Sequence, residues 1–449
     1  MKVRRESLII PAMQPLFIAP PTTVPAPERR KPFLRRRLER MPARSLYPRR
    51  APAQGSRSGW RDAVWTLVGI RTAFWLGTAL TLLWSPLHTH FPVGRAYDPH
   101  TDLLFGTFVQ WDAQWFVHVA DHGYGGTEAT VFFPVYPLVV HGLSLVLGST
   151  IVAGVLISLV AAGVAAVLLV ELARPLLGAG GARDTLLLVA LYPLAFVFTT
   201  VQSDALFLAL SAGAFLAALR GRSWTAGILG AFAVGTRLLG LALVPPLLLL
   251  LRPRGRDARE LARPLPMLLL PAALAGYALY LHEHLGDALA FQHAQHRFWL
   301  RHMSVAGPLQ GLWQALDSAR LGAGELALHL PRQTGAPTGF PTRDQLATWN
   351  VVHLVVLVSA IGLTWVAWRR LGAAYGLYSA ATLALVLLST PRYFPLASVP
   401  RYLLADFPLF MALAALLRDR PRTREVVLFT FACVGAVAAV AYSRKVWIG

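Results

Sequence analysis

Residues 150–172 read TIVAGVLISLVAAGVAAVLLVEL, an apolar run in which Glu171 is the single ionisable residue. A helix of about 20 apolar residues is long enough to cross the roughly 30 Å hydrocarbon core of a bilayer. Similar stretches recur from residue 60 onward and predict about eleven transmembrane helices, at 62–87, 132–147, 150–172, 185–200, 204–219, 224–250, 264–281, 351–368, 373–389, 402–417 and 425–443. The sequence therefore predicts an all-α polytopic membrane protein.

The composition excludes most soluble folds. Of the 449 residues, 55% are hydrophobic and 14% are charged, whereas an ordinary soluble domain has about 25% charged residues. One soluble core could not bury so many apolar side chains, because too many of them would be left facing water. We therefore expect membrane lipids to surround most of the chain.

The positive charge is concentrated at the N-terminal end. The net charge is +20, from 42 Lys and Arg against 22 Asp and Glu. Residues 1–57 are rich in Pro and Arg and lack apolar periodicity, which predicts a disordered basic tail on the cytoplasmic side, followed by a transmembrane domain at 58–449. A basic chain can also bind nucleic acid. We expect no nucleic-acid partner, because the other arginines cluster between apolar stretches as they do in membrane proteins.

Two long segments, 88–131 and 282–350, interrupt the apolar stretches and are expected to be functional outer loops. With the N-terminal tail inside, the first span carries the segment 88–131 to the outer face. Counting every apolar stretch as one crossing places the Arg clusters at 252–263, 369–370 and 418–424 inside, as the positive-inside rule requires.

The same count gives one misfit. It places Arg220 and Arg222 outside while Asp204 lies inside. The stretch 132–147 is short enough to be a partial span, and the stretch 224–250 is long enough to contain a break, which we expect at Pro245 and Pro246. The sequence therefore leaves the membrane face of Asp204 open.

The first outer loop contains FGTFVQWDAQWFVHVADHGYGG at residues 105–126. A helix over 105–122 would have one polar face and one aromatic face, as in a helix that lies along the lipid headgroups. Asp112 would point toward the aromatic side, where a poorly hydrated carboxylate becomes a better proton acceptor, so we predict that it is a general base. The alternative is that Asp112 is the N-cap of a helix that begins at Ala113.

The next segment, VFFPVYPLVV, contains Pro134 and Pro137. Each proline restricts the residue before it, so Phe133 and Tyr136 are expected to be extended before the next helix starts. This would form a rigid aromatic lip beside the site. The alternative is an ordinary helix start with proline in its first turn.

Five motifs occur in a specific order: WDAQWFVHVADHGYG, FFPVYPL, LYPLAFVFTTVQSDALF, LGAFAVGTRLLGLAL and RYLLADFPLF. In this order they resemble the integral-membrane mannosyltransferases related to the second mannosyltransferase of GPI-anchor assembly, within the GT-C class. The resemblance covers about residues 60–417. It implies a GT-C-like fold and an enzyme that takes a hexose, typically mannose, from a polyprenyl-phosphate donor on the outer or lumenal face. It also implies that an acid of the first outer loop lies near the reaction centre.

The resemblance implies candidate substrate-binding residues, which match the family's motifs position by position: Trp111 beside Asp112, Tyr136, Ser203, Asp204, and Arg237 after Thr236. The family usually has Ser–Glu where this chain has Ser203–Asp204. The side chain is one methylene shorter, which puts a close contact from Asp204 in doubt. Arg237 lies in an apolar stretch, where an unpaired charge costs about 2.5–3.5 kcal/mol. We expect it to meet a lipid-linked phosphate or an acid such as Asp204; alternatively, it marks a break between two half-spans.

Further cationic candidates lie in the C-terminal half. Arg392 and Arg401, with Tyr402, bracket the segment TPRYFPLASVPRY and could grip a phosphate by forked hydrogen bonds. Anchoring at the membrane interface is the alternative reading. Arg297, with His293 and Arg301, would form a cationic stripe on a helix in the second loop, which suits either a phosphorylated substrate or a headgroup surface.

Several other chemistries lack their motifs. The chain has no GxxxxGK phosphate loop and no GxSxG elbow, and its histidines lack the context of a zinc site. We expect no structural zinc and no organic cofactor. A divalent cation at Asp112 stays open, because such ions choose oxygen ligands that spacing does not reveal.

The sequence thus predicts a multi-pass bacterial plasma-membrane glycosyltransferase with a cytoplasmic N-terminus and its site on the outer face. Asp112 would deprotonate a hydroxyl of a lipid or glycan acceptor, and arginines would stabilise the departing polyprenyl phosphate. A secondary transporter or lipid flippase is the alternative from another class, since such proteins place charges near the midplane of broken helices. A catalytically silent scaffold is the third reading.

Overall fold

The computed structural model describes residues 56–84, 108–303, 306–328, 343–391 and 394–443, which are largely helical. The predicted tail at 1–57 lies outside these ranges except for its last two residues, and so do residues 88–107 of the first predicted loop and residues 304–305 and 329–342 of the second. The long helices are α2 (Ser56–Trp84), α5 (Thr150–Leu191), α10 (Leu269–Leu285), α12 (Pro308–Leu328), α13 (Arg343–Val366) and α17 (Pro421–Ser443). The remaining elements are α3 (Asp112–His122), η3 (Thr127–Val131), α4 (Val135–Leu147), η4 (Ala195–Thr199), α6 (Asp204–Leu219), α7 (Ser223–Thr236), η5 (Leu238–Leu243), α8 (Val244–Leu250), α9 (Ala258–Leu261), η6 (Leu265–Leu268), α11 (Ala290–Arg297), β1 (Arg301–Met303), η7 (Ala367–Leu371), α14 (Ala373–Leu388), β2 (Ser389–Pro391), α15 (Val399–Leu403) and α16 (Phe407–Leu417).

The described helices are those of a polytopic membrane protein, as predicted. Five helical segments are long and apolar enough to cross a bilayer: 61–80, 150–191, 258–285, 346–371 and 421–443. Shorter apolar helices accompany them, including α6, α14 and α16. The predicted number of eleven spans is not established by these lengths.

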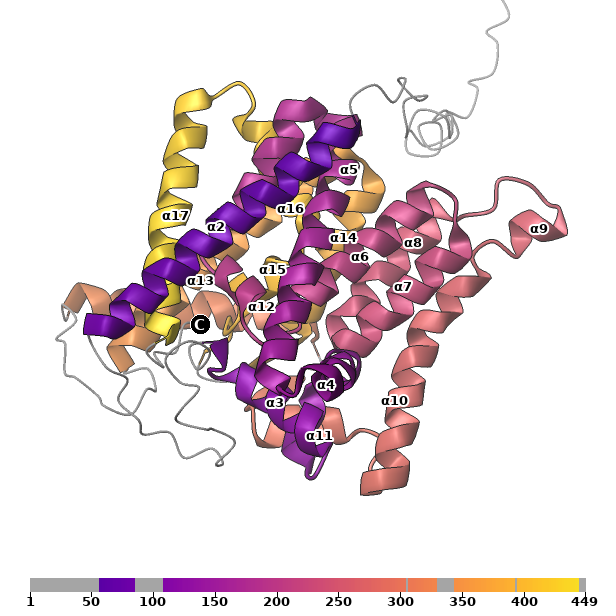
Figure 1. The fold of residues 1–449 in the computed structure, drawn as a ribbon, viewed down its shortest axis with the longest axis horizontal. Helices are drawn as coiled ribbons and strands as arrows, with labels where there is room; N and C mark the ends of the chain where they lie inside the picture. Colours follow the sequence, from indigo (N-terminus) through magenta and orange to yellow (C-terminus); the bar gives the residue numbers. More distant parts are fainter. Residues whose placement is uncertain (1–55, 85–107, 304–305, 329–342, 392–393, 444–449) are drawn as a thin grey trace, which may run out of the picture. The chain divides into compact units, whose positions relative to one another are not determined.

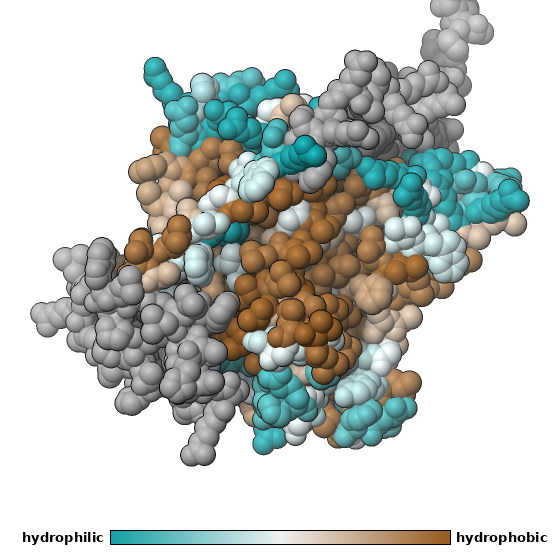
Figure 2. Space-filling view, viewed as in Figure 1, coloured by the Kyte–Doolittle hydropathy of each residue, from teal (hydrophilic) through white to brown (hydrophobic). Residues whose placement is uncertain are grey.

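Apolar side chains gather across the middle of the described surface, with hydrophilic residues at two opposite ends (Figure 2). Val355 on α13 and Phe429 and Val437 on α17 are exposed. Such patches on the outside of a protein mark contact with another apolar phase, here the lipid chains. The surface therefore agrees with the fold class.

The long helix α5 contains a sharp kink at Gly178, where φ is +75°. The chain beyond the kink returns alongside the first half of α5, since Ser158 Oγ donates a hydrogen bond to the Gln202 carbonyl (3.2 Å). Arg71 of α2 fixes this return, because its guanidinium donates to the carbonyls of Ala190 and Ala195. Two predicted spans, 150–172 and 185–200, thus belong to one kinked helix and η4.

The predicted span at 132–147 is the short helix α4, which does not extend along the full length of the neighbouring α5. Helices α3, α4 and α11 lie together at one end of the bundle, whereas α9 lies at the other (Figure 1). The Thr150 hydroxyl, at the start of α5, donates to the Asp121 carboxylate near the end of α3. Helix α4 therefore connects elements at a single end.

The predicted span at 224–250 is in turn broken at Arg237, between α7 and η5. Arg237 pairs with Asp204, so this break lies at the end of the bundle where α6 begins. At the other end of α6, a Cβ built on Gly221 would lie 2.9 Å from the Arg263 guanidinium. Arg220 and Arg222 therefore lie with the 252–263 cluster, and the predicted separation of the two groups is wrong.

The two counting errors cancel beyond residue 250, which is why the later Arg clusters agreed with the count. The stretch 132–147 was counted as one crossing, although α4 stays at a single end of the bundle. The stretch 224–250 was also counted as one crossing, although the chain reverses direction in it at Arg237. The lengths of these two stretches had marked both as doubtful, but hydropathy could not decide either case, because α4 and the η5–α8 segment are both apolar.

Helix α6 is the centre of the core, and nearly all of its residues are buried. It packs between α5 and α7. The strands β1 and β2 pair antiparallel, with Arg301 opposite Pro391. This pairing ties the segment after α11 to the segment between α14 and α15, next to the start of α6.

Candidate active site

Four charged side chains from distant parts of the chain form one cluster. Arg401 Nη2 lies 2.9 Å from Asp204 Oδ2, and Arg401 Nε lies 3.2 Å from the same oxygen. Arg237 Nη1 lies 2.5 Å from Asp204 Oδ1. Arg401 Nη1 also donates to Asp112 Oδ2. Two carboxylates and two guanidiniums thus alternate in a cluster with no net charge.

Local structure explains where each carboxylate lies. Asp112 is the first residue of α3 and Asp204 is the first residue of α6. The N-terminal end of a helix carries a partial positive charge, which stabilises a carboxylate. Arg401 reaches both acids from the short helix α15, and Arg237 comes from the extended residue between α7 and η5. Arg237 therefore both marks a break and pairs with an acid, so the two interpretations of it are compatible.

The members of the cluster differ in accessibility. The Asp204 side chain is 1% exposed, Arg401 is 12% exposed and Arg237 is 13% exposed, whereas Asp112 is 30% exposed. Buried charges need partners because their desolvation is expensive. Asp204 supplies that partner for both arginines, and Asp112 forms the accessible edge of the cluster. Although Asp204 is one methylene shorter than the family's Glu, it makes close contacts.

Two of the rings that the sequence predicted around Asp112, those of Trp115 and Phe116, pack against other aromatic residues. The Trp115 ring stacks on Phe132 at 5.9 Å, and the Phe116 ring packs edge-on against Tyr136 at 5.0 Å. These rings fill the interface between α3 and α4, which leaves the carboxylate to Arg401. The N-cap interpretation is also wrong, since α3 begins at Asp112 itself. The helix is shorter than the predicted 105–122.

Tyr402 lies against the cluster and between two guanidiniums. Arg237 Cζ is 5.7 Å and Arg301 Cζ is 5.5 Å from the centre of the Tyr402 ring. Arg301 Nη2 donates to the Tyr402 hydroxyl (3.2 Å), and the same guanidinium donates to the carbonyls of Ser389 and Ala397. The contacts with Arg237 and Arg301 therefore hold the Tyr402 ring in place between the two guanidiniums, where it bounds the site.

Trp111 and Ser203 precede the two acids of the cluster. Trp111 has a φ of +55°, unusual for a residue other than glycine, and packs against the large hydrophobic core. Ser203 is fully buried, and its hydroxyl has no partner among the described residues. Trp111 and Ser203 occupy the N-cap positions of α3 and α6, without a side-chain cap hydrogen bond in either case.

Tyr136 is inside α4 rather than in an extended segment. Helix α4 begins at Val135, with Pro134 as its N-cap, so the ordinary helix start is correct and the predicted aromatic lip is wrong. The Tyr136 hydroxyl donates to the Gly154 carbonyl (3.1 Å) and lies 3.0 Å from Ser158 Oγ. Its side chain is fully buried between α4 and α5.

The predicted cationic stripe of the second loop is not continuous. Helix α11 ends at Arg297, and Arg301 lies in β1. Arg297 is exposed, and its Cζ lies 5.5 Å from the centre of the Phe298 ring. His293 Nδ1 lies 2.6 Å from Asp287, and this hydrogen bond lowers the pKa of the Asp287 carboxyl. Arg392, the last predicted phosphate ligand, lies outside the described residues.

Within the described ranges, no three His, Cys, Asp or Glu side chains come together as ligands for a metal ion. The carboxylates of Asp112 and Asp204 accept hydrogen bonds from arginine instead.

Sequence reasoning missed a hydrogen-bonded group behind the cluster. The Tyr442 hydroxyl donates a hydrogen bond to the backbone carbonyl of Gln110 (2.8 Å). It accepts hydrogen bonds from the backbone N–H of Gln110 (3.3 Å) and from the side-chain Nε2 of Gln202 (3.0 Å). Gln110 and Gln202 each precede a cluster acid by two residues. Tyr442, at the end of an apolar helix, carries no motif that could have indicated this role.

Comparison with known proteins agrees with the sequence resemblance. The family model described as "Mannosyltransferase (PIG-V)" matches residues 74–249. The protein named GPI alpha-1,6-mannosyltransferase 2 from Cricetulus griseus is 33% identical over 152 residues, which are 31% of each chain. The protein of the same name from Mus musculus is 32% identical over 161 residues, or 33% of this chain and 32% of the relative. The matched part thus spans about a third of these relatives.

Asp112, Asp204 and Arg237 lie within the residues that match the family model, whereas Arg401 lies beyond them. The predicted resemblance to the integral-membrane mannosyltransferases is confirmed over residues 74–249. The structure adds that Arg401, which lies outside the matched residues 74–249, completes the charged cluster by pairing with Asp112 and Asp204.

Proposed function

Related to the PIG-V mannosyltransferases through residues 74–249, this chain is, we propose, a membrane enzyme that moves mannose from a polyprenyl-phosphate donor to a lipid or glycan acceptor. The cluster of Asp112, Arg401, Asp204 and Arg237 carries this proposal. It combines an accessible carboxylate with two guanidiniums, which are the groups that an acceptor hydroxyl and a departing phosphate each require.

In the proposed reaction, Asp112 accepts the proton of the acceptor hydroxyl as its oxygen attacks C1 of the mannose. The bond between C1 and the phosphate oxygen breaks, and the polyprenyl phosphate leaves with the bonding electron pair. Arg401 and Arg237 stabilise the negative charge on this phosphate. Attack opposite the leaving group inverts the configuration at C1, as the family resemblance implies.

Asp204 has a different role in this proposal. It is nearly inaccessible and holds Arg237 and Arg401 in place. We therefore assign it as a positioning residue, with Asp112 as the base. Trp111 and Ser203 support the two acids, and Tyr402 bounds the phosphate side of the site.

The charge distribution supports an orientation with the site on the outer face of a bacterial plasma membrane and the N-terminus in the cytoplasm. Arg220, Arg222 and the 252–263 cluster lie together at the end of α6 opposite the salt-bridged cluster. Basic residues accumulate on the cytoplasmic side of membrane proteins. A lipid donor that already carries its sugar suits an outer site, because no nucleotide sugar has to reach it.

Transport is the second candidate function. A buried charge beside a helix break, as at Arg237, is a feature shared with secondary transporters, although here the break lies at the end of the bundle where α6 begins. Transfer of mannose and movement of an unmodified lipid give different products, so one assay separates the two.

The test is transfer of radiolabelled mannose from polyprenyl-phosphate mannose in membranes that contain the full-length protein. We expect the Asp112→Asn variant to lose transfer by about 10²–10⁴-fold, the usual contribution of a general base. Asp121→Asn is a matched control, since Asp121 is an exposed acid on the same helix, outside the cluster. Unchanged transfer by Asp112→Asn would remove the proposed base, and no transfer by the parent would favour transport.

A further inference from the structure

A patch of arginines lies where α13 ends and where α16 is followed by α17. Helix α13 continues into the π-helical turn η7, which carries two adjacent arginines and packs against α16. Arg370 Nη1 donates a hydrogen bond to the Ala415 carbonyl (3.1 Å), which places η7 beside the last turn of α16. The arginine patch consists of five exposed side chains from η7 and from residues 418–422: Arg369, Arg370, Arg418, Arg420 and Arg422.

The backbone at the end of α13 explains how two adjacent arginines reach the surface. The π-helical turn spans Ala367–Leu371 and is followed by Gly372, where φ is +117°. Glycine adopts such a positive φ at no steric cost. Both ends of the turn are buried, so Arg369 and Arg370 are exposed between them. Turns of this kind frequently occur at functional sites.

The arginine patch carries an uncompensated positive charge. Residues 367–372 and 415–422 contain five arginines and one acid, Asp419, which gives a net charge of +4. Among the described residues, no carboxylate forms a salt bridge with any arginine of the patch, whereas the neighbouring Arg424 pairs with Asp184 (3.4 Å). The patch can therefore attract an anionic group.

The patch lies at the opposite end of the bundle from the salt-bridged cluster. Asp184, the partner of Arg424, follows the kink of α5, and Glu171 precedes the kink and pairs with Arg220 (2.9 Å). Arg220 follows the last residue of α6, whereas Asp204 is the first residue of that helix. The patch is therefore separate from the candidate active site.

An exposed apolar face of α13 leads to the patch. Residues 346–371 are long and apolar enough to cross a bilayer. Four exposed side chains recur every three or four residues and so share one face of the helix: Val355, Val358, Ile361 and Trp365. Tryptophan favours the level of the lipid headgroups, and Arg369 Cζ lies 5.3 Å from the centre of the Trp365 ring. The patch therefore lies where lipid headgroups meet this face.

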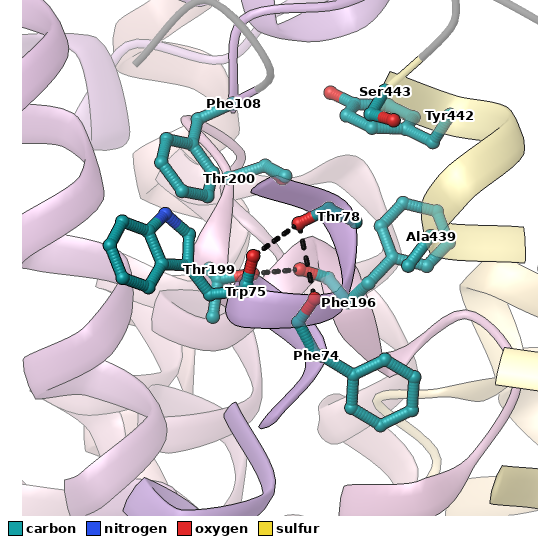
Figure 3. Close-up of a pocket in the computed structure, with 10 residues that line it drawn as sticks. All are labelled: Phe74, Trp75, Thr78, Phe108, Phe196, Thr199, Thr200, Ala439, Tyr442 and Ser443. Atoms are coloured by element: carbon teal, nitrogen blue, oxygen red, sulfur yellow. Dashed lines mark hydrogen bonds between the residues drawn. The ribbon is translucent and has the colours of Figure 1, made fainter. Parts of the chain in front are cut away.

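A pocket elsewhere in the bundle does not offer a comparable site. The pocket bounded by Thr199, Thr200 and Tyr442 has a volume of about 20 Å³, which is room for about one water molecule (Figure 3). None of the described residues that line it is charged. This pocket therefore cannot hold an anionic headgroup.

We propose that the arginine patch binds the headgroup of an anionic phospholipid whose acyl chains lie along the exposed face of α13. Guanidinium groups match phosphate oxygens by paired hydrogen bonds, and basic pockets beside membrane spans bind cardiolipin headgroups. Cardiolipin suits the net charge of +4 because it carries two phosphates on one headgroup. The adjoining apolar face selects a bilayer lipid over a soluble phosphate, since only the lipid contacts both surfaces. The site does not depend on the proposed transfer reaction.

Native mass spectrometry of the full-length protein in detergent measures the affinity for added cardiolipin. We expect the triple variant Arg369→Gln/Arg418→Gln/Arg420→Gln to weaken this affinity at least about tenfold, since each cation near an anionic lipid contributes about fivefold. Arg370 is retained because it donates to the end of α16.

The matched control removes the same charge from another group of exposed arginines. The triple variant Arg252→Gln/Arg256→Gln/Arg259→Gln changes the loop that carries α9, which extends away from the bundle (Figure 1). It should change the affinity for cardiolipin by less than about twofold. A lysine triple at positions 369, 418 and 420 keeps the charge and should stay within about threefold of the parent. The lysine triple thus separates loss of charge from loss of folding.

Several results would overturn the proposal. One is an equal loss of affinity in both glutamine triples, because positive charge in general would then attract the lipid. Another is equal affinity of the parent for zwitterionic phosphatidylcholine. Displacement of cardiolipin by millimolar glycerol 3-phosphate would indicate a site for soluble phosphates instead. Loss of cardiolipin by the lysine triple would contradict recognition by charge.

Discussion

At the residue scale, the central feature is that Arg401 contacts both acids while the proposed base is bound to it. A phosphate that binds Arg401 competes with the Asp112 carboxylate for the same guanidinium. The arrangement therefore couples donor binding to release of Asp112, which would leave the carboxylate free for the acceptor hydroxyl.

This competition gives the first prediction. Asp112→Asn should abolish transfer and at the same time bind polyprenyl phosphate more tightly, because Arg401 loses an anionic competitor. We expect about a tenfold gain in affinity, which corresponds to about 1.4 kcal/mol. Binding of a short-chain polyprenyl phosphate to purified variants measures it, with Asp121→Asn as the control. Weaker binding by Asp112→Asn would show that the carboxylate does not compete with the phosphate.

The second prediction concerns the stability of the cluster. Removing one partner of a buried ion pair costs about 3–5 kcal/mol. Arg401→Gln should lie toward the lower end of this range, because Asp204 keeps Arg237. The measurement is the midpoint of thermal unfolding in detergent.

A double-mutant cycle supplies the control for this prediction. Asp204→Asn combined with Arg401→Gln should destabilise the protein by less than the sum of the single changes, because the two residues interact directly. Additive losses would indicate that the pair contributes no coupling.

Sequence patterns identified each member of the cluster and offered Asp204 as a partner of Arg237, but they did not predict that Arg401 pairs with both acids. Asp112, Asp204, Arg237 and Arg401 were all candidates. Arg401 meets its partners across 197 and 289 residues of sequence, and such contacts depend on tertiary structure that local spacing does not encode. The same separation explains why Tyr442 was missed.

At the element scale, the kink in α5 determines how the chain enters the site. Gly178 has a φ of +75° and no neighbour within 4 Å of an added Cβ. Gly178→Ala should therefore destabilise the protein through backbone strain alone, by about 1 kcal/mol or more. Thermal unfolding measures this change.

Gly163→Ala is the matched control for the kink. Gly163 lies in the regular part of the same helix, and an added Cβ there also meets nothing within 4 Å. Alanine favours helix over glycine by about 0.8–1.0 kcal/mol, so this change should be neutral or stabilising. Equal effects of the two substitutions would mean that the positive φ of Gly178 imposes no strain.

The sequence predicted the helices whose position depends on the length of an apolar stretch. It did not predict the bounds of helices that depend on contacts with other parts of the chain. The runs that became α13 and α17 were recognised as spans, and the gap between the predicted spans 150–172 and 185–200 contains the turn at Gly178. Helix α3 is shorter than predicted because the segment before Asp112 bonds to Tyr442 and to Val201 rather than continuing the helix. Pro137 lies in the first turn of α4, where a proline is tolerated. Its restriction of the preceding residue, Tyr136, therefore did not prevent the helix from starting at Val135.

At the scale of the whole molecule, a group of arginines lies at one end of the helices and the salt-bridged cluster of acids and arginines lies at the other. One end carries Arg220, Arg222 and the arginines around Arg263, while the salt-bridged cluster lies at the other end of α6. Residue counting gave the fold class correctly but misplaced Arg220 and Arg222. The cause was a pair of compensating errors, in α4 and at Arg237, that only three-dimensional contacts could reveal.

This arrangement predicts the sidedness of two labelling sites. In a Cys433→Ser background, which removes the single cysteine, we place a cysteine at Arg222 or at Gln292, an exposed position on α11. A membrane-impermeant maleimide should label Gln292→Cys in intact cells and Arg222→Cys only after permeabilisation. The physical reason is that basic residues remain on the cytoplasmic side, which leaves α11 and the neighbouring α3 outside. Labelling of Arg222→Cys in intact cells would invert the orientation and place the proposed transfer on the cytoplasmic face, where a nucleotide sugar could replace the lipid donor.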